Sequence, residues 1–403
     1  MSTQVHATLT EETVRQIADD LDEPEWLTEK RLEALDALDD LGMPHVIRTP
    51  GRDWTNLADL DYETLVDPIS YAEEKDQVGP DEVEVLAISE ALDQREEVVR
   101  EAFGSVVDPQ ENYLTALSTA LFSTGTVVYV PEGVDAEDVT IRTTMNSRSL
   151  FNYTLVVTEE SSSVTILERQ ESGGDVAGDR YYSGVVEIAA GKNTQVQYGS
   201  LQDLDQDTYV YTRKHASASR DSRVDWIEAN FGGRLTKAGV ETDLDGEGTE
   251  TNILGAFYGI DDQHIDVDAR VWHNAENTTA DLTTRGVLDD EARSVYEGVQ
   301  NVGRDAWRTN SYQREATLML SDESEADASP KLIINNHDTE ASHSATVGQV
   351  DPQDLFYMTS RGVDEDRATD MLVEGFFVPI LDAVEVDELR EDLTAAIRER
   401  LRS

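Results

Sequence analysis

The spacing of hydrophobic and polar positions changes twice along the chain and divides it into three regions. In residues 1–104 apolar positions recur three and four residues apart, which is the period of amphipathic helices. In residues 105–350 short runs alternate apolar and polar positions, which is the period of strands. In residues 351–403 the helical spacing returns. The pattern therefore predicts a strand-rich core between an N-terminal and a C-terminal helical region.

Helix signals are frequent in the N-terminal region. Thr10 is followed by two glutamates, the arrangement of an N-cap with acid in the first turn, and Pro24 marks the end of that helix. A second apolar stripe ends at Gly42, a common C-cap residue, and a third helix is expected from about Asp81 to Phe103. Residues 43–79 are expected to be irregular. Packing accounts for these stripes, and no chemistry is assigned to them.

Short strands follow one another through the core region with no helical pattern between them, as in TVVYV, YTLVVTE and TQVQYGSL. A sandwich, a barrel and a β-solenoid all fit such a pattern. The long succession of strands and the short turns with few prolines favour a solenoid, because stacked coils need little connecting chain. No strict repeat length is found, so the pattern alone leaves the three architectures open.

One strand of this region, HIDVDARVWH, contains two histidines with different expected roles. His264, Asp266 and Asp268 share its polar face and resemble a metal trio, but successive members stand about 6.5–7 Å apart. That spacing is long for one ion, and Arg270 is better placed to pair with Asp268. We therefore do not expect a metal there. His273 lies on the apolar face and is expected to be a hydrogen-bonded core histidine.

Acidic residues dominate the composition. Asp and Glu number 84 against 32 Lys and Arg, and the formal net charge is −52. The acids are spread along the chain, as on the surface of a salt-adapted (halophilic) protein, and salt would screen their mutual repulsion. Disorder is not expected, because 38% of the residues are hydrophobic and alternate regularly. Nucleic acid is not expected as a partner, since phosphate binding requires clustered Lys and Arg.

The chain contains no cysteine, which excludes a disulfide framework and any thiolate ligand of its own. No stretch approaches the ~20 apolar residues of a membrane span, and the N-terminus lacks the layout of a signal peptide. We therefore expect a cytoplasmic protein with no membrane partner. The sequence also lacks a phosphate-binding P-loop, a Gly-x-Ser-x-Gly elbow and a His-Glu-x-x-His motif.

The stretch SHSATVGQ, at residues 342–349, stands where the strand pattern gives way to helix. His343 is its one side chain with ready metal or proton chemistry, because imidazole titrates near neutrality and is a common metal ligand. His337 precedes it by six residues, and on one strand both would project to the same face. On chemistry alone, a histidine that only satisfies hydrogen bonds at a domain junction is the simpler explanation.

The longer run ASHSATVGQVDPQDLFYMTSRG, at residues 341–362, resembles the signature of the SufB/SufD family of iron–sulfur cluster assembly scaffolds. It follows the form of the SufD branch, which is close to Cys-Ser-His-Gly-Ala-Thr-Val-Gly followed by Leu-Phe-Tyr and Ser-Arg-Gly. Two positions depart from that form, since Ala341 replaces Cys and Ser344 replaces Gly. The resemblance extends over most of the chain, through PEWLTEKRLEA, YLTALSTALFSTGTVVYVPEGV and LMLSDESEADASP.

The resemblance implies a mainly β fold, with a right-handed parallel β-helix core, and a non-catalytic scaffold subunit without a tightly bound cofactor. It also implies that the C-terminal edge of the β-helix pairs with a SufB-like subunit. His343 would join a cysteine and a carboxylate of SufB in holding transient iron or an iron–sulfur cluster at that junction. With Ala341 in place of Cys, this chain supplies no thiolate there.

The resemblance further implies that the C-terminal helical region binds a SufC-like ATPase, which uses ATP to move the junction. The residues expected to make this contact are Leu355, Phe356, Tyr357, Arg361, Gly362, Met371 and Phe376. The last segment is amphipathic, with apolar positions recurring from Val386 to Leu401. Packing of this helix on the chain's own β-domain is the alternative expectation for it.

Two other functions are kept as alternatives. A purely structural partner would use His343 only to form hydrogen bonds at the junction, and all cluster chemistry would belong to SufB. A carbohydrate-active β-helix enzyme would place Asp with Lys or Arg on one solenoid face. A surface this rich in acidic residues contains such pairs by chance, so their presence is no evidence for a carbohydrate-active enzyme.

Overall fold

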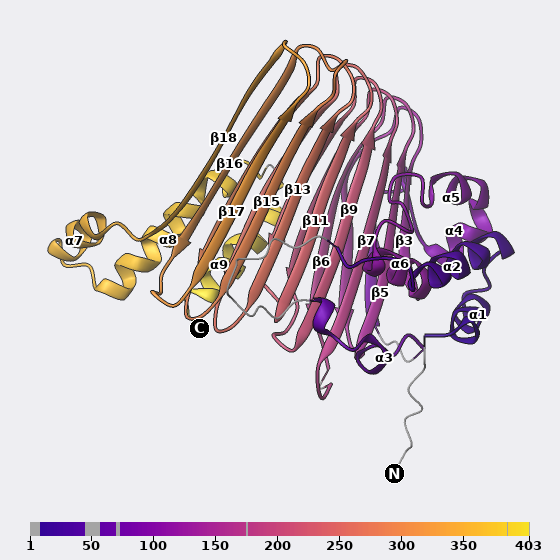
Figure 1. Ribbon diagram of the computed structural model, residues 1–403, viewed down its shortest axis with the longest axis horizontal. Coiled ribbons are helices and arrows are strands. Elements are labelled where there is room, and N and C mark those ends of the chain that lie inside the picture. The colour runs from indigo at the N-terminus through magenta and orange to yellow at the C-terminus, as the bar shows by residue number, and fades with distance from the viewer. Residues whose placement is uncertain (1–8, 45–56, 70–72, 175, 385, 403) are drawn as a thin grey trace.

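Two sheets, parallel except at their N-terminal edge strands, are wound from one strand-rich segment and form the core of the molecule (Figure 1). The computed structural model describes residues 9–44, 57–69, 73–174, 176–384 and 386–402, and the structural statements below refer to these residues. From Thr124 onward consecutive strands alternate between the two sheets, so each coil of chain contributes one strand to each. The prediction of a β-solenoid between helical regions is therefore confirmed, and the sandwich and the barrel are excluded.

Each sheet contains nine of the described strands. Sheet A runs in the order β1 (Glu73–Val78), β4 (Asp135–Met145), β6 (Ser163–Ser172), β8 (Gln195–Asp203), β10 (Arg223–Asn230), β12 (Glu250–Gly259), β14 (Thr279–Leu288), β16 (Thr309–Met319) and β18 (Thr339–Gln349). Sheet B runs in the order β17 (Glu325–Ile334), β15 (Arg293–Val302), β13 (His264–His273), β11 (Leu235–Leu244), β9 (Thr208–Ala218), β7 (Arg180–Ala190), β5 (Ser149–Thr158), β3 (Thr124–Val130) and β2 (Glu84–Ala87).

The coils differ slightly in length, which explains why the sequence shows no strict repeat. Residues that lie opposite each other on neighbouring coils are 26 to 32 positions apart, as for Leu235 with Tyr209 and Ser149 with Tyr181. The turns between the strands accommodate the differences in coil length. Asn193, Asp221 and Asp261 lie in such turns at φ values of 54°, 57° and 51°. Asn and Asp tolerate this left-handed conformation better than other non-glycine residues, so the polar turns have a backbone reason.

The three largest of the four apolar clusters among the described residues pack the main parts of the fold against one another. Inward-facing side chains of both sheets fill the solenoid, with Trp226 and Tyr198 among many valines and isoleucines. The N-terminal helices pack on the outer face of sheet B, against Phe151 and Tyr181. The C-terminal helices pack on the outer face of sheet A, where Phe231 is buried. Each sheet therefore has helices on part of its outer face.

The helices are short and lie at the two ends of the chain. The N-terminal ones are α1 (Glu11–Asp20), α2 (Glu25–Ala37), the 3₁₀ turn η1 (Leu57–Asp59), α3 (Tyr62–Leu65), α4 (Ile88–Gln94), α5 (Glu96–Ala102) and α6 (Tyr113–Leu121). The C-terminal ones are α7 (Pro352–Ser360), α8 (Glu365–Leu381) and α9 (Asp387–Arg400). Thr10 caps α1 as predicted, with its hydroxyl accepting from the backbone N–H of Thr13. No described helix combines the length and the apolar composition that a bilayer crossing requires.

The predicted helix from Asp81 to Phe103 is wrong in its first part. Residues 84–87 form β2, which pairs antiparallel with β3, and the helical structure begins only at Ile88. The predicted irregular segment 43–79 also contains a strand, β1, which pairs antiparallel with β4. Its sequence EEKDQV shows no strand alternation, and it is a strand because β4 offers it an edge. Residues 45–56 and 70–72 of that segment lie outside the described residues.

Candidate functional site

The two ends of the solenoid differ in how their edge strands are protected. At the N-terminal end the edges are β1, a charged strand, and β2, a strand of four residues. Charge and shortness are both devices that discourage further pairing. At the other end the edges are β17 and β18, of 10 and 11 residues, and each pairs with a described strand on one side only. This end therefore presents two long backbone edges (Figure 1).

Apolar side chains are exposed at the β17–β18 end. Ile333 and Ile334 on β17 are each 43% exposed, and Val347 on β18 is 40% exposed. The positions opposite Ile334 and Val347 one coil earlier, Val302 and Thr317, are buried. A long edge with exposed aliphatic side chains is a typical template for pairing with another chain. The surface has the properties of an interface that this chain alone leaves uncovered.

His343 lies on β18, at this open end. Its register places it opposite Gln313, which lies opposite Leu282 one coil further in. Leu282 belongs to the solenoid core, so His343 ends a column of inward-facing positions. It is exposed because no described strand covers β18. The imidazole forms no hydrogen bond with any described residue, and both ring nitrogens are available to a ligand or a partner.

Polar groups lie directly beneath His343 in the preceding coil. Gln313 is buried, its amide nitrogen donates to the hydroxyl of Tyr296 at 3.1 Å, and its amide oxygen has no hydrogen-bond partner among the described residues. Gly298 leaves the space for this amide, because a Cβ there would lie 1.5 Å from Gln313 Nε2. Glu315 is also buried. Burial raises the pKa of its carboxyl, and the Thr317 hydroxyl and the Thr346 backbone N–H partly oppose this rise.

The other histidines and acids considered from the sequence do not add to this site. His337 lies in the bend between β17 and β18, so the expectation that it shares a strand face with His343 is wrong. The Asn336 side chain forms that bend, since its oxygen accepts from the Asp338 backbone N–H at 3.1 Å and from the Thr339 hydroxyl at 2.6 Å. This local turn ends any strand continuation through His337.

Both carboxylates of the trio on β13 pair with cationic side chains, and the pair between Arg270 and Asp268 was expected. Lys237 Nζ lies 2.8 Å from Asp266, and Arg270 donates to both oxygens of Asp268 at 2.8 and 2.7 Å. Burial raises the pKa of Asp266, and the Lys237 ammonium partly offsets the rise. These carboxylates are therefore committed to ion pairs. His264, the third member, does not converge with them on a common point.

His273 is a buried core histidine, which confirms the prediction. The Thr278 hydroxyl lies 2.8 Å from Nδ1, and the Gln300 amide oxygen lies 3.4 Å from Nε2. Burial lowers the pKa of His273 to about 4, and the bond to Gln300 opposes this shift. The ring is therefore neutral at physiological pH and serves the interior of the solenoid.

The residues predicted to contact SufC lie in α7, in the turn after it, and in α8. Helix α7 projects beyond the β18 end of the solenoid (Figure 1) and buries none of its side chains. Phe356 is 72% exposed, and Tyr357 and Met371 are also exposed, whereas Leu355 is half-buried. Arg361 lies over the Tyr357 ring, 5.1 Å from its centroid, and Gly362 adopts a φ of 85° at the turn.

Phe376 is half-buried against the solenoid. Arg285 of β14 lies over its ring at 4.8 Å and donates to its backbone oxygen at 3.0 Å. Packing of the final helix on the β-domain is confirmed, since Leu389, Leu393 and Ile397 of α9 are buried in the cluster on sheet A. The C-terminal region is thus anchored by α8 and α9 and exposes α7.

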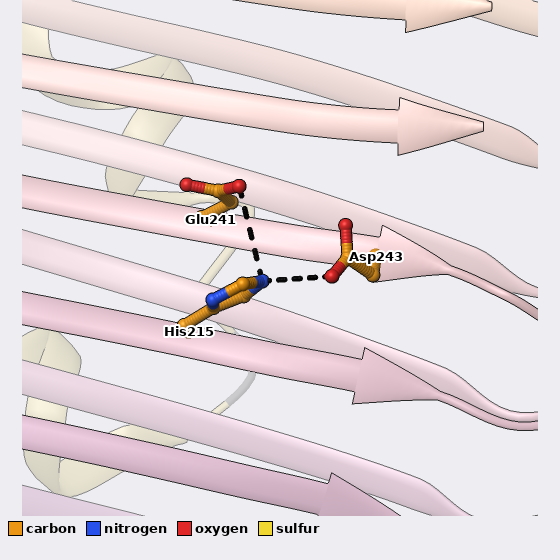
Figure 2. Close-up of side chains that lie close together, drawn as sticks. All are labelled: His215, Glu241 and Asp243. Atoms are coloured by element: carbon orange, nitrogen blue, oxygen red, sulfur yellow. Dashed lines mark hydrogen bonds and ion pairs between the residues drawn. The ribbon is translucent and has the colours of Figure 1, made fainter. Parts of the chain in front are cut away.

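One group of side chains was not anticipated from the sequence. His215 and Asp243 are 28 residues apart but lie side by side on β9 and β11, with Glu241 next to them (Figure 2). Neither spacing nor periodicity signals this group, because only the register between coils brings its members together.

Comparisons with known proteins agree on one family. A family model described as "SUF system FeS cluster assembly, SufBD core domain" matches residues 141–376, and "SufBD protein N-terminal region" matches residues 53–141. The iron–sulfur cluster assembly protein SufD of Bacillus subtilis is 28% identical over 97% of this chain and 98% of its own length. Iron–sulfur cluster assembly SufBD family proteins of Staphylococcus epidermidis and Staphylococcus saprophyticus are each 27% identical over 92% of this chain and 88% of their own length.

Proposed function

The chain belongs to the SufBD family of iron–sulfur cluster assembly proteins, and we propose that within it the chain is a SufD-like, non-catalytic scaffold subunit. In this proposal it pairs with a SufB-like subunit, anchors a SufC-like ATPase, and holds iron or a nascent cluster at the junction with SufB. The iron or cluster is the cargo of the assembly and not a resident cofactor of this chain.

The open end of the solenoid is the observation that carries the proposal. Its edges, β17 and β18, belong to different sheets, so a second solenoid could continue both sheets at once. The backbone groups of 10 and 11 residues would then find partners, and the exposed aliphatic side chains would be buried. Hydrogen bonding and apolar burial favour the same mode of docking. A second β-solenoid is therefore a suitable partner for this end.

The position of His343 at that end supports its proposed role. A chain docked on β18 would cover the imidazole and bring its own side chains next to it. Imidazole and thiolate are both ligands of iron and of iron–sulfur clusters. This chain has no cysteine, and Ala341 occupies the next same-face position on β18, so the thiolates must come from the partner. His343 is the one ligand that this chain is proposed to supply.

The ATPase contact is assigned to α7 and the exposed part of α8. Helix α7 has an exposed aromatic surface, and the apolar contacts of α8 and α9 fix the base of this region on sheet A. A partner bound to α7 could therefore transmit force to the solenoid through packed helices. The position of α7 beyond β18 brings that contact close to the proposed SufB junction (Figure 1).

Co-purification with SufB-like and SufC-like chains at high salt tests the proposal. Val347→Lys, on the open edge of sheet A, is expected to abolish recovery of SufB while leaving the isolated chain folded. Val78→Lys is the matched control, because Val78 is 54% exposed on β1, the opposite edge of the same sheet. Equal recovery of SufB by both variants would refute docking at the β17–β18 end, and no recovery by the parent chain would refute the proposed function.

A further inference from the structure

His215, Glu241 and Asp243 converge on one point on the outer face of sheet B (Figure 2). The imidazole Nε2 of His215 lies 3.0 Å from Asp243 Oδ2 and 3.9 Å from Glu241 Oε1. One potential ligand atom from each residue lies within 4.8 Å of the other two. Among the residues that the structure describes, no other set of three or more His, Asp or Glu side chains meets this criterion.

The sheet itself fixes these positions. Strands β9 and β11 are parallel neighbours, and His215 lies directly opposite Glu241. Asp243 lies opposite Ser217, the next position of β9 on the same face. Neighbouring strands are about 4.8 Å apart, so side chains at these positions reach a common point without distortion of the backbone. Sites built on strands are held more rigidly than sites built on loops.

Glu241 is oriented by donors behind it. Arg213 donates to its Oε2 at 2.6 Å, and the indole N–H of Trp272 donates to Oε1 at 2.5 Å. Burial on its own would raise the pKa of Glu241, but Arg213 and then His215 oppose it, and the net pKa is lowered. Hydrogen-bonded carboxylates of this kind, with their direction set by outer neighbours, are typical of metal ligands.

Negative charge exceeds positive charge around the three residues. Within the described ranges, no Lys or Arg lies within 4.0 Å of the Asp243 carboxylate, which has only His215 as a possible cationic partner. The nearby Asp245 is bonded by neutral donors, the Ser217 hydroxyl and the Asn274 amide, each at 2.8 Å. Arg213 is shared between Glu241 and Glu111. A bound cation would offset this excess.

Hydrogen bonding within the group joins only two of its three members. A protonated Nε2 donates well to Asp243 at 3.0 Å, but Glu241 at 3.9 Å lies beyond hydrogen-bond distance. The three potential ligand atoms nevertheless lie within 4.8 Å of one another. Ligands with bonds of about 2.1 Å to one small cation lie about 3–3.5 Å apart, so small side-chain rotations would bring all three into coordination.

We propose that His215, Glu241 and Asp243 bind one divalent cation of the first transition row, such as Mn²⁺, Fe²⁺ or Zn²⁺. One imidazole and two carboxylates suit these ions, whereas Mg²⁺ and Ca²⁺ prefer oxygen ligands alone. Three protein ligands leave positions for water, so the ion is exchangeable. The site lies on β9 and β11, away from the open-end strand β18, and does not depend on the proposed function.

Binding of Mn²⁺ to the full chain, followed by electron paramagnetic resonance in molar KCl, tests the site. The salt suppresses unspecific attraction of cations to a chain of net charge −52. The parent is expected to bind one Mn²⁺, and Zn²⁺ is expected to displace it. His215→Gln and Asp243→Asn should each weaken binding by at least about tenfold.

Two control variants separate this site from other acids and from His343. Asp245→Asn removes a neighbouring acid outside the ligand set, and His343→Gln removes the imidazole of the open end; both should retain the bound Mn²⁺. Far-UV circular dichroism establishes that each variant is folded. Unchanged Mn²⁺ affinity in folded His215→Gln and Asp243→Asn, or no saturable Mn²⁺ and Zn²⁺ binding by the parent, would overturn the proposal.

Discussion

Lys214 of β9 pairs with Glu228 of β10 across the inside of the solenoid. The ammonium lies 2.9 and 2.7 Å from the two carboxylate oxygens, and both side chains are buried. Burial raises the pKa of Glu228 to about 6, even though Lys214 lowers it. Near the pair, the Tyr198 hydroxyl donates to Glu168 at 2.9 Å. The pair thus joins the two sheets through a polar contact inside the solenoid.

Removing one partner of this pair should destabilise the protein strongly. Lys214→Met leaves the Glu228 carboxylate buried without its counter-ion, a change that typically costs about 3–5 kcal/mol. Urea unfolding in molar KCl at pH 7.5 measures the loss. The double variant with Lys214→Met and Glu228→Gln should recover most of it, because no charge is then left buried. A single variant within about 0.5 kcal/mol of the parent would show that the pair does not contribute as the structure indicates.

The stability of the chain should depend on pH through His273. Its folded pKa of about 4 is lower than the ordinary value of 6.5, so the unfolded state binds the proton more readily between these values. Stability relative to His273→Gln should therefore fall as the pH falls from about 6.5 to about 4, by about 3 kcal/mol in total. Unfolding free energies of the two proteins at a series of pH values provide the measurement. A difference that does not vary with pH would contradict the buried, neutral histidine.

Two phenylalanines of the C-terminal region should respond differently to the same substitution. Phe356 is exposed on α7, so the unfolding free energy of Phe356→Ser should lie within about 0.5 kcal/mol of the parent value. The same substitution should weaken SufC binding at least about tenfold. Phe377 is buried on α8 next to Tyr258, so Phe377→Ser should cost about 3–5 kcal/mol. Calorimetric titration with the SufC-like ATPase checks the first expectation and urea unfolding the second. Undiminished SufC binding by Phe356→Ser would remove α7 from the proposed contact.

Much of the architecture could be predicted from local patterns. Alternation in HIDVDARVWH correctly placed His273 in the core. The same reasoning failed at β1, because EEKDQV carries no alternation and acquires its strand conformation from the edge of β4. It failed at β2 because four apolar and acidic residues before Ile88 fit a helix as well as a strand. Edge strands depend on their neighbours, and a single segment does not show them.

The candidate sites depend on register, which explains what the sequence could and could not show. His343 was found through a resemblance, and the structure adds that it lies opposite Gln313 at an edge with no described partner strand. His215 and Asp243 are on different coils, and coils of 26 to 32 residues give no fixed offset with which to align them. His337 was expected on the strand of His343, but the side-chain hydrogen bonds of Asn336 form a turn there instead.

The central claim is that His343 supplies a ligand at the junction with a SufB-like subunit. The direct measurement is the iron and sulfide content, with the visible absorption of the cluster, of the complex reconstituted with SufB-like and SufC-like chains. His343→Ala should assemble normally and lower cluster content at least about tenfold, while His337→Ala, in the exposed bend between β17 and β18, should match the parent. An assembled His343→Ala complex with the cluster content of the parent would contradict the claim and leave the chain a purely structural partner.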